Sequence, residues 1–268
     1  MLIVFGALKI ELIHILRSIH IDNIHKNGKT VIYEGSKNSR PVTIIQTGMG
    51  VKNARRAAEF FKDNYSEYAK SGSAGPGKNT EVLMIGFCGA ADRSIKAGDT
   101  VVYRSIKNIE HSDEKGFLAS GILDLNGEKI LDSPVSDGFI GAAGANVPEV
   151  ITSPAVKKKL NSDFDVQAID MESYWIGEAV REMKLPFSCI RVVSDGADDA
   201  LPSYFESSGG AGMVLNIILS SIRSIFSKKE FRSNIGALKN LRKANLRLAE
   251  VSKNLISSLT ADTLDKTL

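Results

Sequence analysis

Strand-like apolar segments alternate with helical ones along nearly the whole chain, and this alternation restricts the fold more than any other feature. The strand-like segments are 2–5, 42–46, 81–85, 99–103, 166–169 and 186–193. The segments with a helical pattern are 9–19, 51–64, 155–160, 171–183 and a long one from residue 203. Such alternation predicts an α/β fold with a largely parallel or mixed sheet. Segment 186–193 is almost continuously apolar, so we expect both of its faces to be buried.

The length of 268 residues suits one large α/β domain, which we expect to span residues 1–230. Residues 231–268 are expected to form a basic C-terminal helix and tail. Within them, 237–256 carries five Lys and Arg residues and has leucines at helical spacing. Two interpretations stand side by side. The segment is either a packing helix with a solvated charged face, or a helix that contacts an anionic membrane surface peripherally.

Charge and cysteine usage exclude several classes of function. The 34 basic and 31 acidic residues leave a net charge of only +3, which is too balanced to indicate nucleic-acid binding. Cys88 and Cys189 both lie in apolar runs, which is typical of reduced, buried thiols in a cytoplasmic protein. The four histidines show no metal-ligand spacing. We therefore expect neither a metal nor a cofactor.

Polar or glycine-rich residues stand where five of the predicted strands end, at 6–11, 48–53, 86–92, 170–172 and 194–199. Ligands of open α/β sheets bind beyond the carboxyl ends of the strands. Three carboxylates, Glu11, Glu172 and Asp195, lie in these segments. Each alone has an ordinary explanation as a turn cap or a first-turn acid that interacts with a helix dipole. Gathering three like charges at one sheet edge is costly, so together they indicate a use.

Three carboxylates suit the cleavage of a ribose–base bond, which passes through an oxocarbenium-like sugar. One acid protonates the departing purine, and a second carboxylate takes a proton from the attacking water. A third accepts hydrogen bonds from the ribose hydroxyls and holds the ring in place.

At these residues the chain resembles the nucleoside phosphorylase/nucleosidase superfamily. Within it, the chain is most similar to methylthioadenosine/S-adenosylhomocysteine nucleosidases and to their hopanoid-biosynthesis relatives. The segments that carry the resemblance are 6–11, 47–50, 86–92 followed by 96–99, 170–173 and 191–195. They keep the family order from residue 1 to about residue 226. The resemblance implies a three-layer α/β/α fold with a twisted mixed central sheet.

The resemblance also implies roles for individual residues. Asp195 matches the acid at the purine N7, and Glu11 matches the carboxylate that activates water. Glu172 matches the carboxylate that holds the ribose hydroxyls, and Met171 matches the residue that packs under the sugar. Ser194 and Phe87 are expected to line the same substrate site. Segment 149–153 stands where the family lays backbone and an aromatic ring against the base, but it contains no aromatic residue.

The chain departs from the phosphate-using members of the family. Met84 and Phe87 stand near the positions where hexameric phosphorylases have an Arg and a Ser. Since a guanidinium binds phosphate through paired hydrogen bonds and Met cannot, this favours water as the nucleophile. The expected activity is hydrolysis of a 5′-substituted adenosine, of the methylthioadenosine/S-adenosylhomocysteine type or linked to a hopanoid, by a homodimer or larger homo-oligomer.

Two alternatives remain open at this point. A phosphate-dependent phosphorylase would need Arg55, Arg56 or Arg104 to supply its phosphate site. A non-catalytic nucleoside-binding protein would keep the fold, but it has no need of a water-activating carboxylate such as Glu11.

Overall fold

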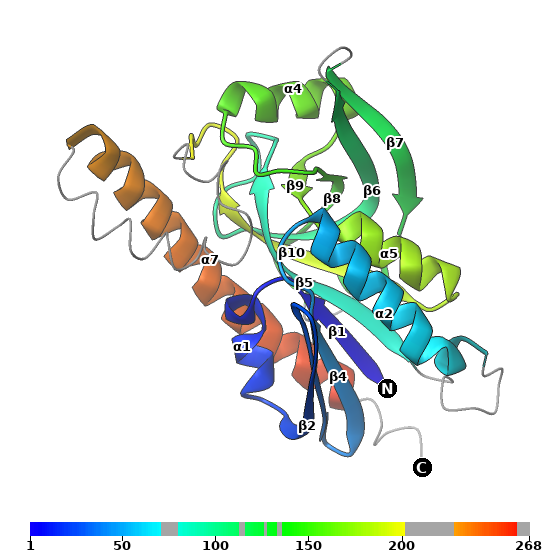
Figure 1. Ribbon diagram of the computed structural model, residues 1–268. Helices are drawn as coiled ribbons and strands as arrows, with labels where there is room; N and C mark the ends of the chain where they lie inside the picture. The colour runs from blue at the N-terminus through cyan, green and yellow to red at the C-terminus, as the bar shows by residue number, and fades with distance from the viewer. Residues whose placement is uncertain (71–79, 113–115, 126–127, 133–135, 202–227, 262–268) are drawn as a thin grey trace.

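A mixed sheet of ten strands runs through the molecule, with helices against both of its faces (Figure 1). The computed structural model describes residues 1–70, 80–112, 116–125, 128–132, 136–201 and 228–261. Its elements are, in order, β1 (Leu2–Gly6), α1 (Lys9–Leu16), β2 (His20–Asn27), β3 (Thr30–Lys37), β4 (Arg40–Gln46), α2 (Val51–Lys70), β5 (Glu81–Ala90), β6 (Thr100–Ser112), β7 (Gly116–Asp124), α3 (Glu128–Leu131), β8 (Phe139–Asn146), α4 (Pro154–Phe164), β9 (Ala168–Asp170), α5 (Ser173–Glu182), β10 (Phe187–Asp195) and α7 (Lys228–Ala261).

Part of the sheet closes on itself. Strand β5 pairs in parallel with β1 and β10 and antiparallel with β9. From β10 the pairing continues antiparallel to β6, then in parallel to β8 and β9, which returns it to β5. On the other side of β1, the sheet extends through β4, β3 and β2. Strands β1, β5 and β10 are therefore central, and their carboxyl ends meet at one edge.

The first strand shows how the sequence produces three layers. In β1, the side chains of Ile3 and Phe5 pack into the cluster beneath α2 and α5, and those of Leu2 and Val4 pack beneath α1 and α7. Successive residues of a strand point to opposite faces, so a strand that is apolar at every position must be covered on both sides. All five residues of β1 are buried, as are the central residues of β10. The expected α/β/α architecture and the two buried faces of β10 are confirmed.

The turn-rich parts of the chain were the least predictable. The β2–β3 hairpin has no counterpart among the expected elements. The described residues between 107 and 148 belong to the end of β6 and to β7, α3 and β8, of which none was assigned from the sequence. Strand β2 is exposed along most of its length, so it lacks the apolar alternation that identifies a half-buried strand. The helix expected from residue 203 falls outside the described residues up to 227.

Helix α7 begins earlier than expected and belongs to the core. Its residues Ala244, Leu248, Val251 and Leu255 are buried against α1 and the sheet. This packing accounts for the amphipathic pattern of the segment without a membrane. Within the described residues, no helix is both long and apolar enough to span a bilayer. The division of the chain at residue 230 stays a prediction, since α7 shares the core of the preceding strands.

Candidate active site

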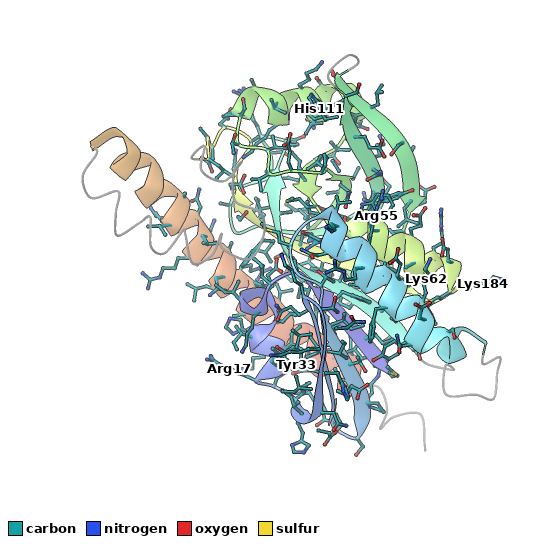
Figure 2. All side chains as sticks on the ribbon, in the orientation of Figure 1. Arg17, Tyr33, Arg55, Lys62, His111 and Lys184 are labelled. Carbon is teal, nitrogen blue, oxygen red and sulfur yellow. The ribbon has the colours of Figure 1, made fainter. Side chains whose placement is uncertain are left out.

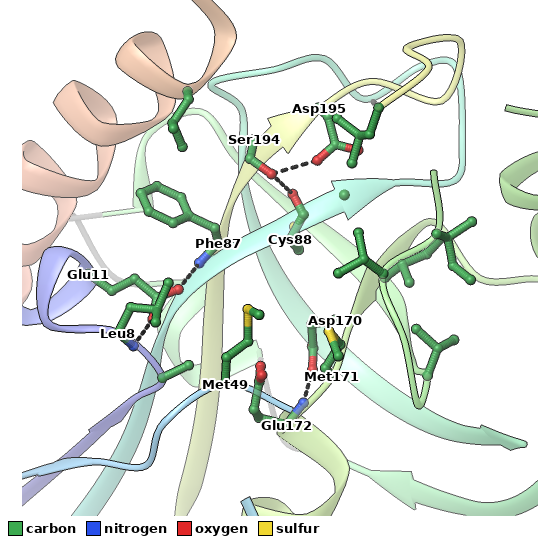
Figure 3. A pocket seen from close by; sticks show the side chains of 18 of the residues that line it. Leu8, Glu11, Met49, Phe87, Cys88, Asp170, Met171, Glu172, Ser194 and Asp195 are labelled. Carbon is green, nitrogen blue, oxygen red and sulfur yellow. Dashed lines mark hydrogen bonds between the residues drawn. The ribbon is translucent and has the colours of Figure 1, made fainter. Parts of the chain in front are cut away.

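A pocket opens where the carboxyl ends of β1, β5, β9 and β10 meet (Figure 3). All six residues singled out from the sequence line it: Glu11, Phe87, Met171, Glu172, Ser194 and Asp195. They come from four separate segments of the chain, and Met49 of the fifth predicted segment also lines the pocket, so the convergence of strand ends predicted from the sequence is observed. The hydrogen bonds and burial of each residue show what its side chain can do in the pocket.

Glu11 caps its own helix and also faces the pocket. Its Oε2 accepts a hydrogen bond from the Leu8 amide at 2.7 Å, and its Oε1 accepts one from the Phe87 amide at 2.8 Å. The first bond satisfies a free N–H group at the start of α1, and the second ties that helix to β5. Burial raises the pKa of Glu11, while the Arg191 charge and the backbone donors partly oppose the shift. The carboxyl group is thus held in one orientation and is easier to protonate than a solvated one.

Glu172 precedes α5 and reaches across to the turn after β4. Its Oε1 accepts a hydrogen bond from the Gly50 amide at 2.7 Å. Gly50 has φ of 90°, a left-handed conformation that favours glycine. Burial raises the pKa of Glu172 to about 7, although the Arg191 charge lowers it. The capping of α5 is left to Asp170, whose Oδ1 accepts the amides of Glu172 and Ser173.

Asp195 ends β10 at an irregularity in the register with β5. Such irregularities redirect side chains, and here the carboxylate faces the pocket. Its Oδ1 lies 2.6 Å from Ser194 Oγ, which also lies 3.1 Å from the carbonyl oxygen of Cys88. A Cβ at Gly89 would lie 3.0 Å from Asp195 Oδ2, so glycine at this position leaves room for the carboxylate.

Sequence reasoning missed Lys157, a fully buried lysine of α4 that lines the same pocket. Its Nζ donates to Asp195 Oδ2 at 2.5 Å and to the carbonyl oxygens of Gly196 and Asp199 at 3.0 and 3.1 Å. An ammonium group has three N–H donors, and these three acceptors use all of them. Lys157 therefore enters the site as the partner of Asp195.

Arg191 is the second residue without an expected role. It lies at the centre of β10 with no exposed surface, and its Nη2 is 3.5 Å from Asp170 Oδ1. Its positive charge acts on the pKa values of both Glu11 and Glu172. An arginine in the middle of an otherwise apolar strand was the pattern that could have identified it.

The aromatic residue that the family lays against the base has no counterpart in segment 149–153, as the sequence indicated. Val150 and Ile151, which lie where the family places it, line the pocket as aliphatic side chains, and Phe87 is the one aromatic residue of the described lining. Helix α7 adds Ala237, Leu238 and Leu241 to the lining. These contributions from α7 were not expected, and they make one wall of the pocket apolar.

None of the three arginines considered for a phosphate site lines this pocket within the described residues. Arg55 stacks on Trp175 with its guanidinium carbon 3.6 Å from the ring centroid, on the α2–α5 side of the molecule (Figure 2). Arg104 is exposed, and Arg56 lies beside Gly28 in the β2–β3 turn. Met84 is buried in the core, so only Phe87 of the two diagnostic positions faces the pocket.

A comparison with protein families matches residues 2–208 to the model of the phosphorylase superfamily. The chain belongs to this superfamily. The match includes all six predicted site residues and the strands that carry them, but not α7, which adds Ala237, Leu238 and Leu241 to the lining.

Individual relatives agree with this assignment. A 5′-methylthioadenosine/S-adenosylhomocysteine nucleosidase of Haemophilus influenzae is 26% identical over 223 residues, which cover 76% of this chain and 89% of the relative. A Staphylococcus epidermidis protein of the same name is 23% identical over 218 residues, covering 76% and 90%.

Solved structures share the fold at low identity. Futalosine hydrolase of Helicobacter pylori superposes with a TM-score of 0.68 at 15% identity, covering 96% of this chain and 97% of its own. The Neisseria meningitidis 5′-methylthioadenosine/S-adenosylhomocysteine nucleosidase, bound to methylthio-immucillin-A, gives 0.65 at 16% identity, covering 96% and 98%.

Proposed function

We propose that the protein hydrolyses the N-glycosidic bond of a 5′-substituted adenosine and releases adenine. The observation that carries the proposal is the meeting of Glu11, Glu172 and Asp195 at one pocket of a phosphorylase-superfamily fold. The names of the curated relatives support adenosine derivatives with a 5′ thioether as the substrate class.

The proposed reaction gives each group one task. Asp195 donates a proton to N7 of the purine while the C1′–N9 bonding pair stays with the base. Water forms the new bond to C1′ and gives its proton to Glu11. Glu172 accepts hydrogen bonds from the ribose hydroxyls, Met171 packs under the sugar, and Ser194 holds the Asp195 carboxyl group through the 2.6 Å contact.

Water is the better-supported nucleophile because the described lining offers no free cation for phosphate. Lys157 is the one Lys or Arg in that lining, and its three donors are already bonded to protein oxygens. Phe87 presents an apolar ring where the phosphate-using members have a hydroxyl. A phosphoryl group placed there would lose its hydration without gaining donors.

The 5′ substituent is proposed to lie against the apolar part of the lining. Leu8, Ile10, Phe87, Leu238 and Leu241 supply this surface. Either a short thioether or a larger group such as a hopanoid would bury apolar area there, at about 25 cal/mol per Å².

A substrate panel tests the proposal. Adenosine, methylthioadenosine, S-adenosylhomocysteine, a 5′-alkylthioadenosine with a long chain, and inosine are each incubated with the protein with and without phosphate. We expect adenine from the 5′-substituted adenosines at rates that phosphate does not change. Strict dependence on phosphate would indicate the phosphorylase alternative, and tight binding with no base release would indicate a binding protein.

We also propose that the protein assembles as a homodimer or a larger homo-oligomer, a proposal that rests on the family resemblance. Light scattering on the purified chain tests it. A monomer across the micromolar range would exclude it.

The basic face of α7 supports a further proposal of peripheral contact with anionic membranes. Lys239, Arg242 and Lys243 are exposed there, and Leu246 is 64% exposed beside them. Each such charge contributes about 1 kcal/mol near an anionic surface. Sedimentation with anionic and neutral vesicles, comparing wild type with the Lys239→Glu/Arg242→Glu variant, tests it. Equal pelleting of the two proteins would exclude the contact.

A further inference from the structure

The pairing of Lys157 with Asp195 places a buried ammonium group directly behind the acid that the proposed reaction needs. The two side chains are 1% and 11% exposed, and Nζ lies 2.5 Å from Oδ2. Burying a lysine–carboxylate pair removes two charges from water, and a pair of apolar side chains of similar volume is often as stable or more so. A pair of this kind at the wall of a pocket therefore suggests a chemical role.

The surroundings of the pair hold both groups in place. Besides Asp195, the ammonium group contacts the carbonyl oxygens of Gly196 and Asp199. The Asp199 carboxylate turns the other way, to the Gly196 amide and to Asn240 of α7. Among the described residues, Asp195 is thus the one carboxylate that Lys157 contacts, so a change in the charge of Asp195 acts directly on the ammonium group of Lys157.

We propose that Lys157 is a positioning residue that supplies, through Asp195, the proton delivered to the departing purine. In this step a proton leaves Lys157 Nζ for the Asp195 carboxylate, whose two oxygens exchange by rotation about the Cβ–Cγ bond. The carboxyl group passes a proton to N7 of the base as the C1′–N9 bond breaks, and the bonding pair stays with the purine. Lys157 is left as an amine and takes a proton from solvent after the base departs. The inference rests on the proposed function and assigns the source of its acid.

The test compares two leaving groups, because only one of them needs a proton. Methylthioadenosine must be protonated at the base, whereas the 4-nitrophenyl riboside with the same 5′ group releases a stable phenolate unaided. The Lys157→Met variant removes the ammonium group and keeps the length of the side chain. We expect it to lower kcat/KM for methylthioadenosine by roughly 100-fold or more, the effect typical of a lost general acid, and to leave nitrophenyl riboside cleavage within fivefold of wild type. The matched control is Lys158→Met, which removes the adjacent, half-exposed lysine of α4 and its surface contact with Asp198. It should leave both rates unchanged.

A second comparison covers the case in which Lys157→Met destabilises the fold by leaving Asp195 buried without its partner. Asp195→Asn and the double variant Lys157→Met/Asp195→Asn both lack that charge. If Lys157 acts through Asp195, the double variant cleaves methylthioadenosine within threefold of Asp195→Asn. The inference is overturned if the double variant loses a further 100-fold, if Lys157→Met slows both substrates equally, or if it slows neither. A wild-type protein that cleaves neither substrate would instead refute the proposed function itself.

Discussion

The Gly50 amide donates a hydrogen bond to Glu172 Oε1 at 2.7 Å, and this bond joins the turn after β4 to the start of α5. It fixes one oxygen of a carboxyl group that is 4% exposed. Because burial raises the pKa of Glu172 to about 7, the group changes charge within the range in which the protein would work.

Glu172→Gln should weaken the use of ribosides and remove part of the pH dependence of the enzyme. A ribose with two hydroxyl donors is held best by the ionised carboxylate, so wild-type kcat/KM should rise up to tenfold per unit as pH approaches about 7 and then level off. The glutamine variant should lack that rise and should discriminate less between ribo and 2′-deoxyribo substrates. An unchanged preference for ribosides would show that Glu172 does not hold the 2′-hydroxyl.

The same shift predicts the sign of a stability effect. A carboxyl group whose pKa rises on folding contributes stability that is complete below its ordinary value of 4.5 and is lost as pH rises through about 7. The Tm of wild type minus the Tm of Glu172→Gln should therefore decrease as pH rises from 4.5 to 8. Melting curves of the two proteins across this range test the sign, and an opposite trend would contradict the assignment of the shift to burial.

Asp195→Asn should lose roughly 100- to 10,000-fold in the rate of base release, with much less effect on binding. The amide has nearly the same shape and keeps a hydrogen bond to Ser194, but it cannot deliver a proton. Single-turnover measurements isolate the chemical step. A variant within threefold of wild type in that step would show that the acid is misassigned.

Gly86→Ala, a substitution in the central strand β5, should inactivate the enzyme. A Cβ at Gly86 would lie 2.5 Å from Glu11 Oε1 and 2.7 Å from Arg191 Nη1, so one of these groups must move. Displacing a catalytic group by about 1 Å can cost on the order of 100-fold in rate. The control is Gly236→Ala in α7, where a Cβ meets nothing within 4 Å. Gly236→Ala should retain full activity. If Gly86→Ala is as active as this control, Glu11 has no role in the reaction.

Leu248→Ala should destabilise the protein by about 2–5 kcal/mol, because Leu248 is completely buried between α7 and the sheet. Leu246→Ala, two residues away on the exposed face, should change stability by less than about 0.5 kcal/mol. Denaturant unfolding of both variants measures this difference. Equal effects would mean that α7 does not pack as described.

The strand ends were predictable because burial and polarity change abruptly there. The apolar run of β10 stops at Ser194 and Asp195, and such a change in the sequence marks both the sheet and its ligand edge. Lys157 was not predictable in the same way, since it begins a run of three lysines, and such runs are usually solvated. Lys157 lies three residues before Leu160, which is also buried. This spacing was the one local sign that Lys157 lies on the inward face of α4. The part of the pocket lined by α7 was not predictable either. It depends on packing between this helix and residues more than 200 positions earlier in the chain, which local sequence patterns do not reveal.

Hydrolysis in water enriched in ¹⁸O, without phosphate, tests the central claim most directly. The protein is incubated with methylthioadenosine, and both products are analysed by mass spectrometry. If water attacks C1′, the freed methylthioribose carries one ¹⁸O atom, bonded to C1′, and the adenine carries none. Failure to release adenine until phosphate is added, with the sugar recovered as its 1-phosphate, would contradict the account.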